Sequence, residues 1–236
     1  MLLSLLMVLL LGCSPEQPKR ENIYLSPVSE GASFNAAFLI IDGVYNSELM
    51  APYDIFQHTI FHTEGGIKVF TVSQTLDTVT TFEGLNILPD YAFDSPELPE
   101  IDVLVVPSAE HNMDSDLENE VLIDWVADIG KKAAYTVSLC DGAFVLAKAG
   151  LVKGRESTTF PSDIARYRQL FPSLKVHEEV SFVHDQNLLT SAGGAKSYDV
   201  ALYLVHHLYG EKVAKGVGKG LVIDWDVNDY KFISVE

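Results

Sequence analysis

The stretch that decides the fold is Tyr135-Thr136-Val137-Ser138-Leu139-Cys140-Asp141-Gly142-Ala143-Phe144. An apolar run leads to Cys140, and two small residues and a helical pattern follow it, so we expect a strand, a sharp turn and a helix. Ligands of parallel α/β sheets sit beyond the carboxyl ends of the strands, which is where Cys140 falls. The pattern is typical of a nucleophile elbow, in which Gly142 and Ala143 leave room for the turn and for a substrate.

Similar alternations of strand and helix extend on both sides of this turn. Apolar runs predict strands at 34–41, 67–72, 101–106, 133–138, 180–183 and 188–190, and helical spacing predicts helices at 48–62, 117–129, 162–170, 196–209 and from 211 onward. The stretch from 73 to 89, with Gly84 in its middle, predicts a hairpin. Strands that alternate with helices require crossover connections, so we predict a doubly wound α/β fold, a mostly parallel sheet with helices on both faces. Residues 34–236 then form a single domain, which their number suits.

The charge balance argues against polyanionic partners. The 236 residues contain 16 Lys and Arg against 33 Asp and Glu, which gives a formal net charge of -17. Such a surface repels phosphate backbones and anionic lipids, so we expect neither nucleic acid nor a membrane face as an electrostatic partner. The acidic residues are spread along the chain, as in a solvated surface.

The first residues predict a route to the membrane. Residues 1–12 are an apolar run too short to span a bilayer, and the run ends at Gly12-Cys13, which resembles the lipobox of bacterial lipoproteins. By that resemblance, residues 1–12 are a signal segment and Cys13 is lipidated. No Lys or Arg precedes the run, and a buried first strand is the alternative. The polar, proline-containing residues 14–33 predict a flexible tether, so we expect a protein held at the periplasmic or extracytoplasmic face of the bacterial cell envelope by lipid alone.

Cys140 is the only cysteine besides Cys13, so an acylated Cys13 leaves it without a disulfide partner in the chain. Two interpretations stay open from the spacing alone. A helix N-terminus would favour the thiolate, which makes Cys140 a nucleophile. A single cysteine can equally be a small buried hydrophobic residue.

Several short motifs, in this order and spacing, resemble the ThiJ/PfpI superfamily over nearly all of residues 35–222. Within it they resemble the branch that contains isonitrile hydratases and the sensor domains of some transcription regulators. The motifs are Gly43-Val44, Glu48, Pro52-Tyr53-Asp54-Ile55-Phe56, Asp102-Val103-Leu104-Val105-Val106-Pro107, Cys140-Asp141-Gly142-Ala143, Ala149-Gly150-Leu151-Val152-Lys153-Gly154-Arg155, Thr158-Thr159, Thr190-Ser191-Ala192-Gly193-Gly194-Ala195 and Asp199. The resemblance implies a flavodoxin-like, class I glutamine-amidotransferase-like fold with Cys140 at the elbow.

Matched residue by residue, Glu48 falls where the family places an acid beside the cysteine sulfur. Three positions depart from the family pattern. Asp141 replaces the histidine of protease-like members, which argues against peptidase activity; Phe160 replaces a histidine of hydratase-like members; and Ser108-Ala109 replace a Gly-Gly pair that supplies an oxyanion-hole amide. Alanine resists positive φ, so this loop must differ from the family's or lose the amide.

These residues lead to one functional hypothesis. Cys140 attacks an electrophilic carbon of a small molecule, Glu48 tunes the sulfur, and a water completes hydration or hydrolysis. Two roles stay open for the Asp141 side chain: it repels a neighbouring thiolate and so lowers its reactivity, or it holds the attacking water. The amides of Asp141 and Ala109 hold the developing charge, and Ser108 and His111 line the pocket.

Other expectations accompany this hypothesis. It requires no cofactor, and His58 and His62 lack a third ligand for a metal. The alternative functions are a non-catalytic small-molecule-binding or sensing module and a redox stress-protective protein. From the resemblance we also expect a homodimer.

Overall fold

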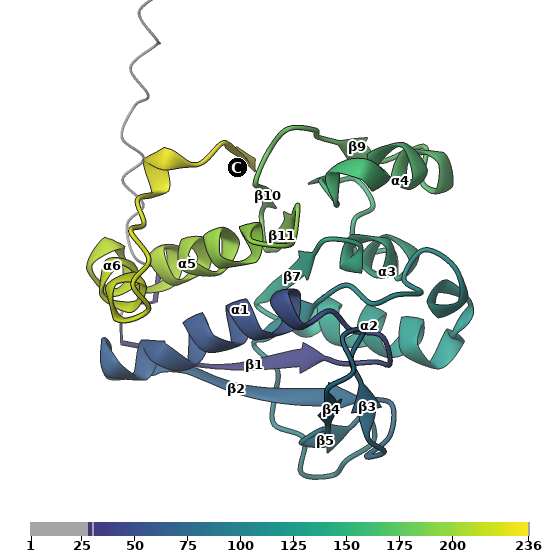
Figure 1. Ribbon diagram of the computed structural model, residues 1–236, viewed down its shortest axis with the longest axis horizontal. Helices are drawn as coiled ribbons and strands as arrows, with labels where there is room; N and C mark the ends of the chain where they lie inside the picture. Colours follow the sequence, from purple (N-terminus) through teal and green to yellow (C-terminus); the bar gives the residue numbers. More distant parts are fainter. Residues whose placement is uncertain (1–27, 30, 236) are drawn as a thin grey trace, which may run out of the picture.

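The centre of the computed structural model, which describes residues 28, 29 and 31–235, is an eight-stranded sheet. Its strand order is β12-β10-β11-β7-β6-β1-β2-β5 (Figure 1). The strands are β1 (Ser33–Leu39), β2 (Gly66–Ser73), β5 (Tyr91–Ala92), β6 (Val103–Val106), β7 (Tyr135–Leu139), β10 (Phe182–Asp185), β11 (Leu188–Ser191) and β12 (Phe232–Val235). Only the pairing of β10 with β11 is antiparallel. The predicted doubly wound α/β fold is confirmed.

Helices cover both faces of this sheet. They are α1 (Asn46–His58), α2 (Glu120–Lys132), α3 (Gly142–Lys148), α4 (Ile164–Leu170), α5 (Lys196–Tyr209) and α6 (Glu211–Gly220). Figure 1 shows α1, α5 and α6 gathered together, and their apolar residues share one core cluster with Ala36 and Phe38 of β1. Ala37 and Leu39 of the same strand belong to the opposite core cluster, with α2 and α3. Because successive side chains alternate between two buried faces, β1 reads in the sequence as one continuous apolar run.

Smaller elements complete the fold. The predicted hairpin is present as the antiparallel pair β3 (Val79–Thr80) and β4 (Asn86–Ile87), and β8 (Glu156–Ser157) pairs with β9 (Lys175–Val176). Four 3-10 segments are η1 (Thr59–Phe61), η2 (Ser115–Glu118), η3 (Pro161–Asp163) and η4 (Val227–Asp229). The helix expected from 117 begins at Glu120, because the Asn119 side chain accepts the Leu122 N–H at 3.2 Å and so caps the helix there.

The domain begins slightly before the expected residue 34. The Val28 N–H donates to the His207 carbonyl, the Ser29 N–H donates to the Leu208 carbonyl, and the Tyr209 hydroxyl donates to the Ala32 carbonyl at 3.1 Å. The last residues of the expected tether are thus fastened to the end of α5. The expected signal segment and Cys13 lie outside the described residues, and the lipid anchor stays a prediction. Within the part of the chain that the structure describes, no helix has the length and apolar character needed to cross a bilayer.

His207 of α5 packs against His184 of β10. The rings of His184 and His207 lie 5.0 Å apart between centroids, and His207 Nε2 is 3.1 Å from the Tyr135 hydroxyl. The Nδ1 atom of His207 is buried and has no hydrogen-bond partner among the described residues. Burial, followed by the proximity of His184 and His206, lowers the pKa of His207 to about 4. The cluster therefore holds its rings neutral at neutral pH.

The low pKa of His207 predicts a loss of stability in mild acid. Because this pKa lies below the ordinary value of 6.5, the unfolded chain binds the proton more readily than the folded chain between about pH 6.5 and 4. The stability that a neutral His207 maintains is present above that window and is lost as the pH falls through it. After discounting for partial exposure, we expect a loss of ~1–2 kcal/mol, measured by urea unfolding at several pH values.

The matched variant is His207→Gln, which keeps a polar group near Tyr135 and does not titrate. Asp141 opposes the trend, because its raised pKa makes the folded chain the tighter proton binder. Both proteins keep Asp141, so the difference between their pH profiles isolates His207. Identical profiles would contradict the assignment.

Candidate active site

Cys140 occupies a strained turn between β7 and α3. Its φ of 52° lies in the left-handed region, which costs a non-glycine residue about 1–3 kcal/mol and tends to occur at functional sites. The Cys140 N–H donates to the Ser191 carbonyl at 3.0 Å, which fastens the turn to the end of β11. The sharp turn that the sequence predicted is therefore present, and it is held in place by the neighbouring strand.

Two glycines allow the turn to pack this closely. A Cβ atom at Gly142 would lie 2.1 Å from the Val106 carbonyl oxygen, and one at Gly193 would lie 2.3 Å from the Cys140 Cβ. Real Cβ atoms do not approach other atoms so closely, and the Gly142 contact is with backbone that cannot move aside. Gly142 thus serves the turn as expected, and Gly193 closes it from the side of β11.

Thr159 braces the turn from a third direction. Its hydroxyl lies 3.0 Å from both the Cys140 carbonyl oxygen and Asp141 Oδ1. The single hydrogen of this hydroxyl can be donated to only one of the two at a time. Thr159 was quoted in the sequence only as half of a threonine pair, without a role.

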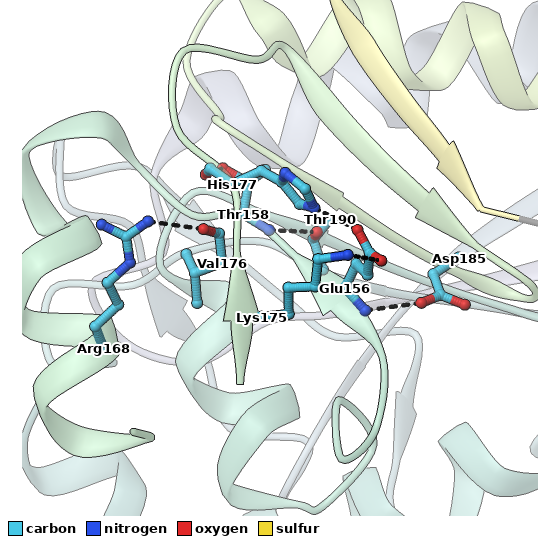
Figure 2. Close-up of polar contacts among 8 residues, drawn as sticks. All are labelled: Glu156, Thr158, Arg168, Lys175, Val176, His177, Asp185 and Thr190. Atoms are coloured by element: carbon cyan, nitrogen blue, oxygen red, sulfur yellow. Dashed lines mark hydrogen bonds and ion pairs between the residues drawn. The ribbon is translucent and has the colours of Figure 1, made fainter. Parts of the chain in front are cut away.

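The segment that carries Thr159 is itself anchored, as Figure 2 shows. The Glu156 N–H donates to Asp185 Oδ2 at 2.7 Å, and the Thr158 N–H donates to Thr190 Oγ1 at 2.9 Å. The Thr158 hydroxyl donates to the His177 carbonyl at 2.9 Å, which ties the segment to the residue after β9. These bonds connect β8 to β10, β11 and β9, so the brace under Cys140 is part of a fixed framework.

Glu48 approaches the site from the first turn of α1. It is 5% exposed, and its carboxylate accepts hydrogen bonds from the Ser108 hydroxyl at 2.6 Å and the Gly194 N–H at 2.9 Å. Ser108 follows β6, and Gly194 follows β11, so this carboxylate joins three segments around the elbow. In both bonds the Glu48 side chain is the acceptor.

The surroundings of the Cys140 sulfur favour the neutral thiol. Cys140 is 7% exposed, and burial, then the negative charges of Asp141 and Glu48, raise the pKa of its thiol well above the ordinary range. Hydrogen bonds from Ser108 and the Asp141 N–H lower this pKa by less. The sequence had favoured a thiolate at a helix N-terminus, but α3 has only seven residues and two acids flank the sulfur. Of the interpretations left open by the sequence, the direction of the shift favours a buried neutral cysteine in the resting protein over a thiolate.

Asp141 is suited to exchange a proton near neutral pH. Burial, followed by the negative charge of Asp163, raises the pKa of Asp141 to about 6. Hydrogen bonds from Thr159 and from the Cys140 thiol limit the rise. A carboxyl group with such a pKa is mostly ionised at pH 7 and can accept the proton of an adjacent thiol.

Ala109 does not offer the amide that the sequence analysis assigned to it. The Ala109 N–H donates to Asn112 Oδ1 at 2.8 Å, and the residue makes an antiparallel bridge with Val44. Its φ is not positive, so the loop takes a course that alanine accepts. The amide is already bonded, and the structure does not support an oxyanion role for it.

His111 lies apart from the sulfur contacts. Its Nδ1 is 3.3 Å from Asp114 Oδ1, its side chain is about half exposed, and it lines a cavity of about 390 Å³ with Asp42, Asp77 and Asp116. None of the charged groups that shift the pKa of Cys140 is a histidine. Among residues 28, 29 and 31–235, no group of three His, Cys, Asp or Glu side chains is arranged to hold a metal ion.

Tyr45 is a site residue that the sequence reasoning missed. Burial and then the charge of Cys140 raise the pKa of its hydroxyl, with Glu110, Glu48 and Asp141 adding to the effect. Its ring lies 4.6 Å from that of Phe82 between centroids. The only available signal was its position directly after Gly43-Val44, which does not by itself imply proximity to Cys140.

The site defines a class of doubly wound α/β proteins. In this class a buried cysteine lies on a strand-to-helix elbow at the carboxyl edge of the sheet, with two acids beside it. The DJ-1/PfpI family matches residues 35–207. The chain therefore belongs to the DJ-1/PfpI family.

Two relatives and one solved structure illustrate this membership. The chain is 30% identical to isonitrile hydratase of Pseudomonas putida over 179 residues, which cover 75% of this chain and 73% of the relative. It is 25% identical over 195 residues to protein dj-1beta of Drosophila melanogaster, covering 82% of this chain and all of the relative. The crystal structure of Drosophila melanogaster DJ-1beta covers 82% of this chain and all of that chain, with a TM-score of 0.71 at 24% identity.

The direction of the Cys140 pKa predicts slow alkylation at neutral pH. We expect iodoacetamide to label wild-type Cys140 slowly at pH 7 and faster as the pH rises, because only the thiolate reacts. Asp141→Asn removes a negative charge beside the sulfur and should increase the rate at pH 7 by about 10-fold. Intact-mass measurement over time gives both rates.

Asp128→Asn is the control, because Asp128 pairs with Lys132 on the exposed face of α2. Fast labelling of the wild type at pH 7, unchanged in Asp141→Asn, would show that the two acids do not suppress the thiolate.

Proposed function

We propose that this protein is a hydratase that uses Cys140 to add water to a small molecule with an isonitrile-type carbon. One observation carries the proposal: the thiol sits on a strained elbow in contact with Asp141, whose pKa of about 6 suits proton exchange at neutral pH. The similarity to the isonitrile hydratase of Pseudomonas putida supports the substrate class.

The first step joins the substrate to the enzyme. Asp141 accepts the thiol proton as Cys140 Sγ bonds to the terminal carbon of R–N≡C, and the same carbon receives that proton. The product of this step is a thioimidate, R–N=CH–S–Cys140. One S–H bond and one π bond of the isonitrile triple bond are lost as one C–S and one C–H bond form, so the step needs no oxidant or reductant.

The second step releases the product. Water adds to the thioimidate carbon while Asp141 accepts one of its protons, and collapse of the adduct expels the sulfur. The protons end on the amide nitrogen and on the thiol, which gives R–NH–CHO and regenerates Cys140. The Asp141 N–H, which hydrogen-bonds the sulfur in the resting site, stabilises the negative charge on the departing sulfur.

Ser108 acts as a positioning residue in this proposal. Its hydroxyl donates to Glu48 at 2.6 Å and also lies within hydrogen-bonding reach of the Cys140 sulfur. Because the hydroxyl has one hydrogen, it can serve Glu48 or the sulfur, but not both at once. Turning the hydroxyl toward the sulfur breaks its bond to Glu48, so Ser108 links Glu48 to the reactivity of Cys140.

A specific observation favours a second candidate function, a non-catalytic binding module. The Ala109 amide is bonded to Asn112, so it is not free to hold an oxyanion. The resting thiol is neutral, so the site also lacks a preformed thiolate. Such a module would bind a small electrophile or metabolite without converting it.

Turnover of a simple alkyl isonitrile tests the proposed function. We expect the purified protein to form the N-substituted formamide, detected by mass spectrometry, and Cys140→Ala to reduce the rate to background. Asp141→Asn should reduce kcat by about 10²-fold. The wild-type kcat/KM should rise with pH through about 6, as Asp141 loses its proton.

Ser138→Ala is the matched control for these variants. Its hydroxyl is buried on β7, two residues from Cys140, and has no hydrogen-bond partner among the described residues. It should therefore retain activity. Binding of the isonitrile without formamide formation, unchanged in Cys140→Ala, would replace the hydratase with the binding module.

Ser108→Ala tests the link between Glu48 and the sulfur. Loss of a hydrogen bond to a charged group should reduce kcat by about 10-fold and shift the midpoint of the pH profile, because Glu48 then acts on the sulfur without the intervening hydroxyl. The Ser138→Ala profile should match the wild type. A lower rate with an unmoved midpoint would limit Ser108 to a structural role.

A further inference from the structure

We propose a second ligand site, for a phosphate-bearing small molecule or headgroup, in a cationic cavity at the edge of the sheet opposite Cys140. The cavity has a volume of about 270 Å³. Its lining comes from the end of α2, the loop between α3 and β8, and the starts of β7 and β11. The volume is near the lower end of the range for small-molecule pockets and suits a phosphate with a small organic group.

The position separates this cavity from the candidate active site. Thr136 lines it near the start of β7, and Cys140 follows the other end of the same strand. At about 3.3 Å per residue, the four residue steps from Thr136 to Cys140 span roughly 13 Å. A ligand in the cavity would therefore not contact the sulfur.

The charge of the lining is unusual for this chain. Acidic residues outnumber basic ones by 33 to 16, yet the cavity is lined by Lys131, Lys153 and Arg155 and by no Asp or Glu. At physiological ionic strength charges are screened beyond about 8 Å, so the charges near the cavity, and not the net charge of -17, determine its potential, and the three cations line it directly.

None of the three cations has an ion-pair partner among the described residues. Lys131 and Lys153 make no such pair, whereas Lys132, the neighbour of Lys131 on α2, lies 2.7 Å from Asp128. Most other ion pairs in the described chain place a lysine or arginine against an acid in the same way. Like charges brought together without a partner repel each other, and a bound anion would relieve the repulsion.

Arg155 provides a pre-positioned donor. Its Nη1 donates to Asn187 Oδ1 at 2.5 Å, and the Asp185 carbonyl lies 3.4 Å away, which fixes the plane of the guanidinium group. No hydrogen bond of its Nη2 or Nε occurs among the described residues. A fixed guanidinium presents paired donors that match phosphate oxygens, and the flexible lysines add charge around them. Three cations suit a phosphate dianion better than a single carboxylate.

Titration with inorganic phosphate tests the site directly. At constant ionic strength set with chloride, we expect phosphate to bind by calorimetry and to raise Tm by a few degrees at saturation. The double variant Lys131→Gln/Lys153→Gln should weaken phosphate binding by at least 10-fold. Lys132→Gln, the matched control one residue away, should bind as the wild type does.

Two further measurements complete the test. Phosphate binding should be unchanged in Cys140→Ala, so failure of the proposed hydratase activity would leave this site standing. Sedimentation with phosphatidic acid vesicles distinguishes a lipid headgroup from a soluble phosphate compound as the ligand. Vesicle binding that depends on Lys131 and Lys153 indicates a lipid headgroup. Phosphate binding without vesicle binding indicates a soluble compound. Equal phosphate affinity in the wild type and the double variant, or no binding to either, would overturn the proposal.

Discussion

The left-handed backbone of Cys140 is the constraint on which the rest of the site depends. A φ of 52° lets the chain end β7 and begin α3 within two residues, which leaves the side chain at the carboxyl edge of the sheet. Several contacts from the surrounding structure must hold so costly a backbone conformation in place. They come from the Ser191 carbonyl, the Thr159 hydroxyl and the close approach of Gly193. Ser191 ends β11 and Gly193 follows it two residues later, whereas Thr159 lies in the segment after β8. The turn is therefore fastened both to the end of β11 and to the segment after β8.

The same geometry concentrates acidic groups. Cys140, Asp141 and Glu48 are all less than 10% exposed, and three negative charges so close together in a buried place would repel strongly. Burial, followed by the negative charges of Asp141 and Glu48, raises the pKa of the Cys140 thiol. Burial, followed by the charge of Asp163, raises the pKa of Asp141. The hydroxyls of Ser108 and Thr159 supply the hydrogen bonds that make the burial tolerable.

Local pattern was enough to predict the main strands, the helices and the elbow, because buried strands and amphipathic helices leave periodic signals. It could not predict β5, β8 or β9, which have two residues each, or β12, whose place beside β10 depends on Phe232 stacking on Phe182. Glu48 was found only through the family resemblance, since α1 and β7 are far apart in the sequence. The engagement of the Ala109 amide and the direction of the Cys140 pKa depend on tertiary neighbours that no local pattern reveals.

A neutral thiol among acids restricts the substrates that the site can serve. Enzymes that attack carbonyl carbons need a thiolate in advance, and this site opposes one. The terminal carbon of an isonitrile is different, because it accepts a proton as well as a nucleophile. An acid with a pKa of about 6 can deliver that proton while the sulfur forms its bond, so charge never accumulates on an isolated thiolate. A neutral thiol with acidic neighbours disfavours hydrolysis by a cysteine nucleophile. Under the proposed function, these same two features suit the addition of both a proton and sulfur to one carbon.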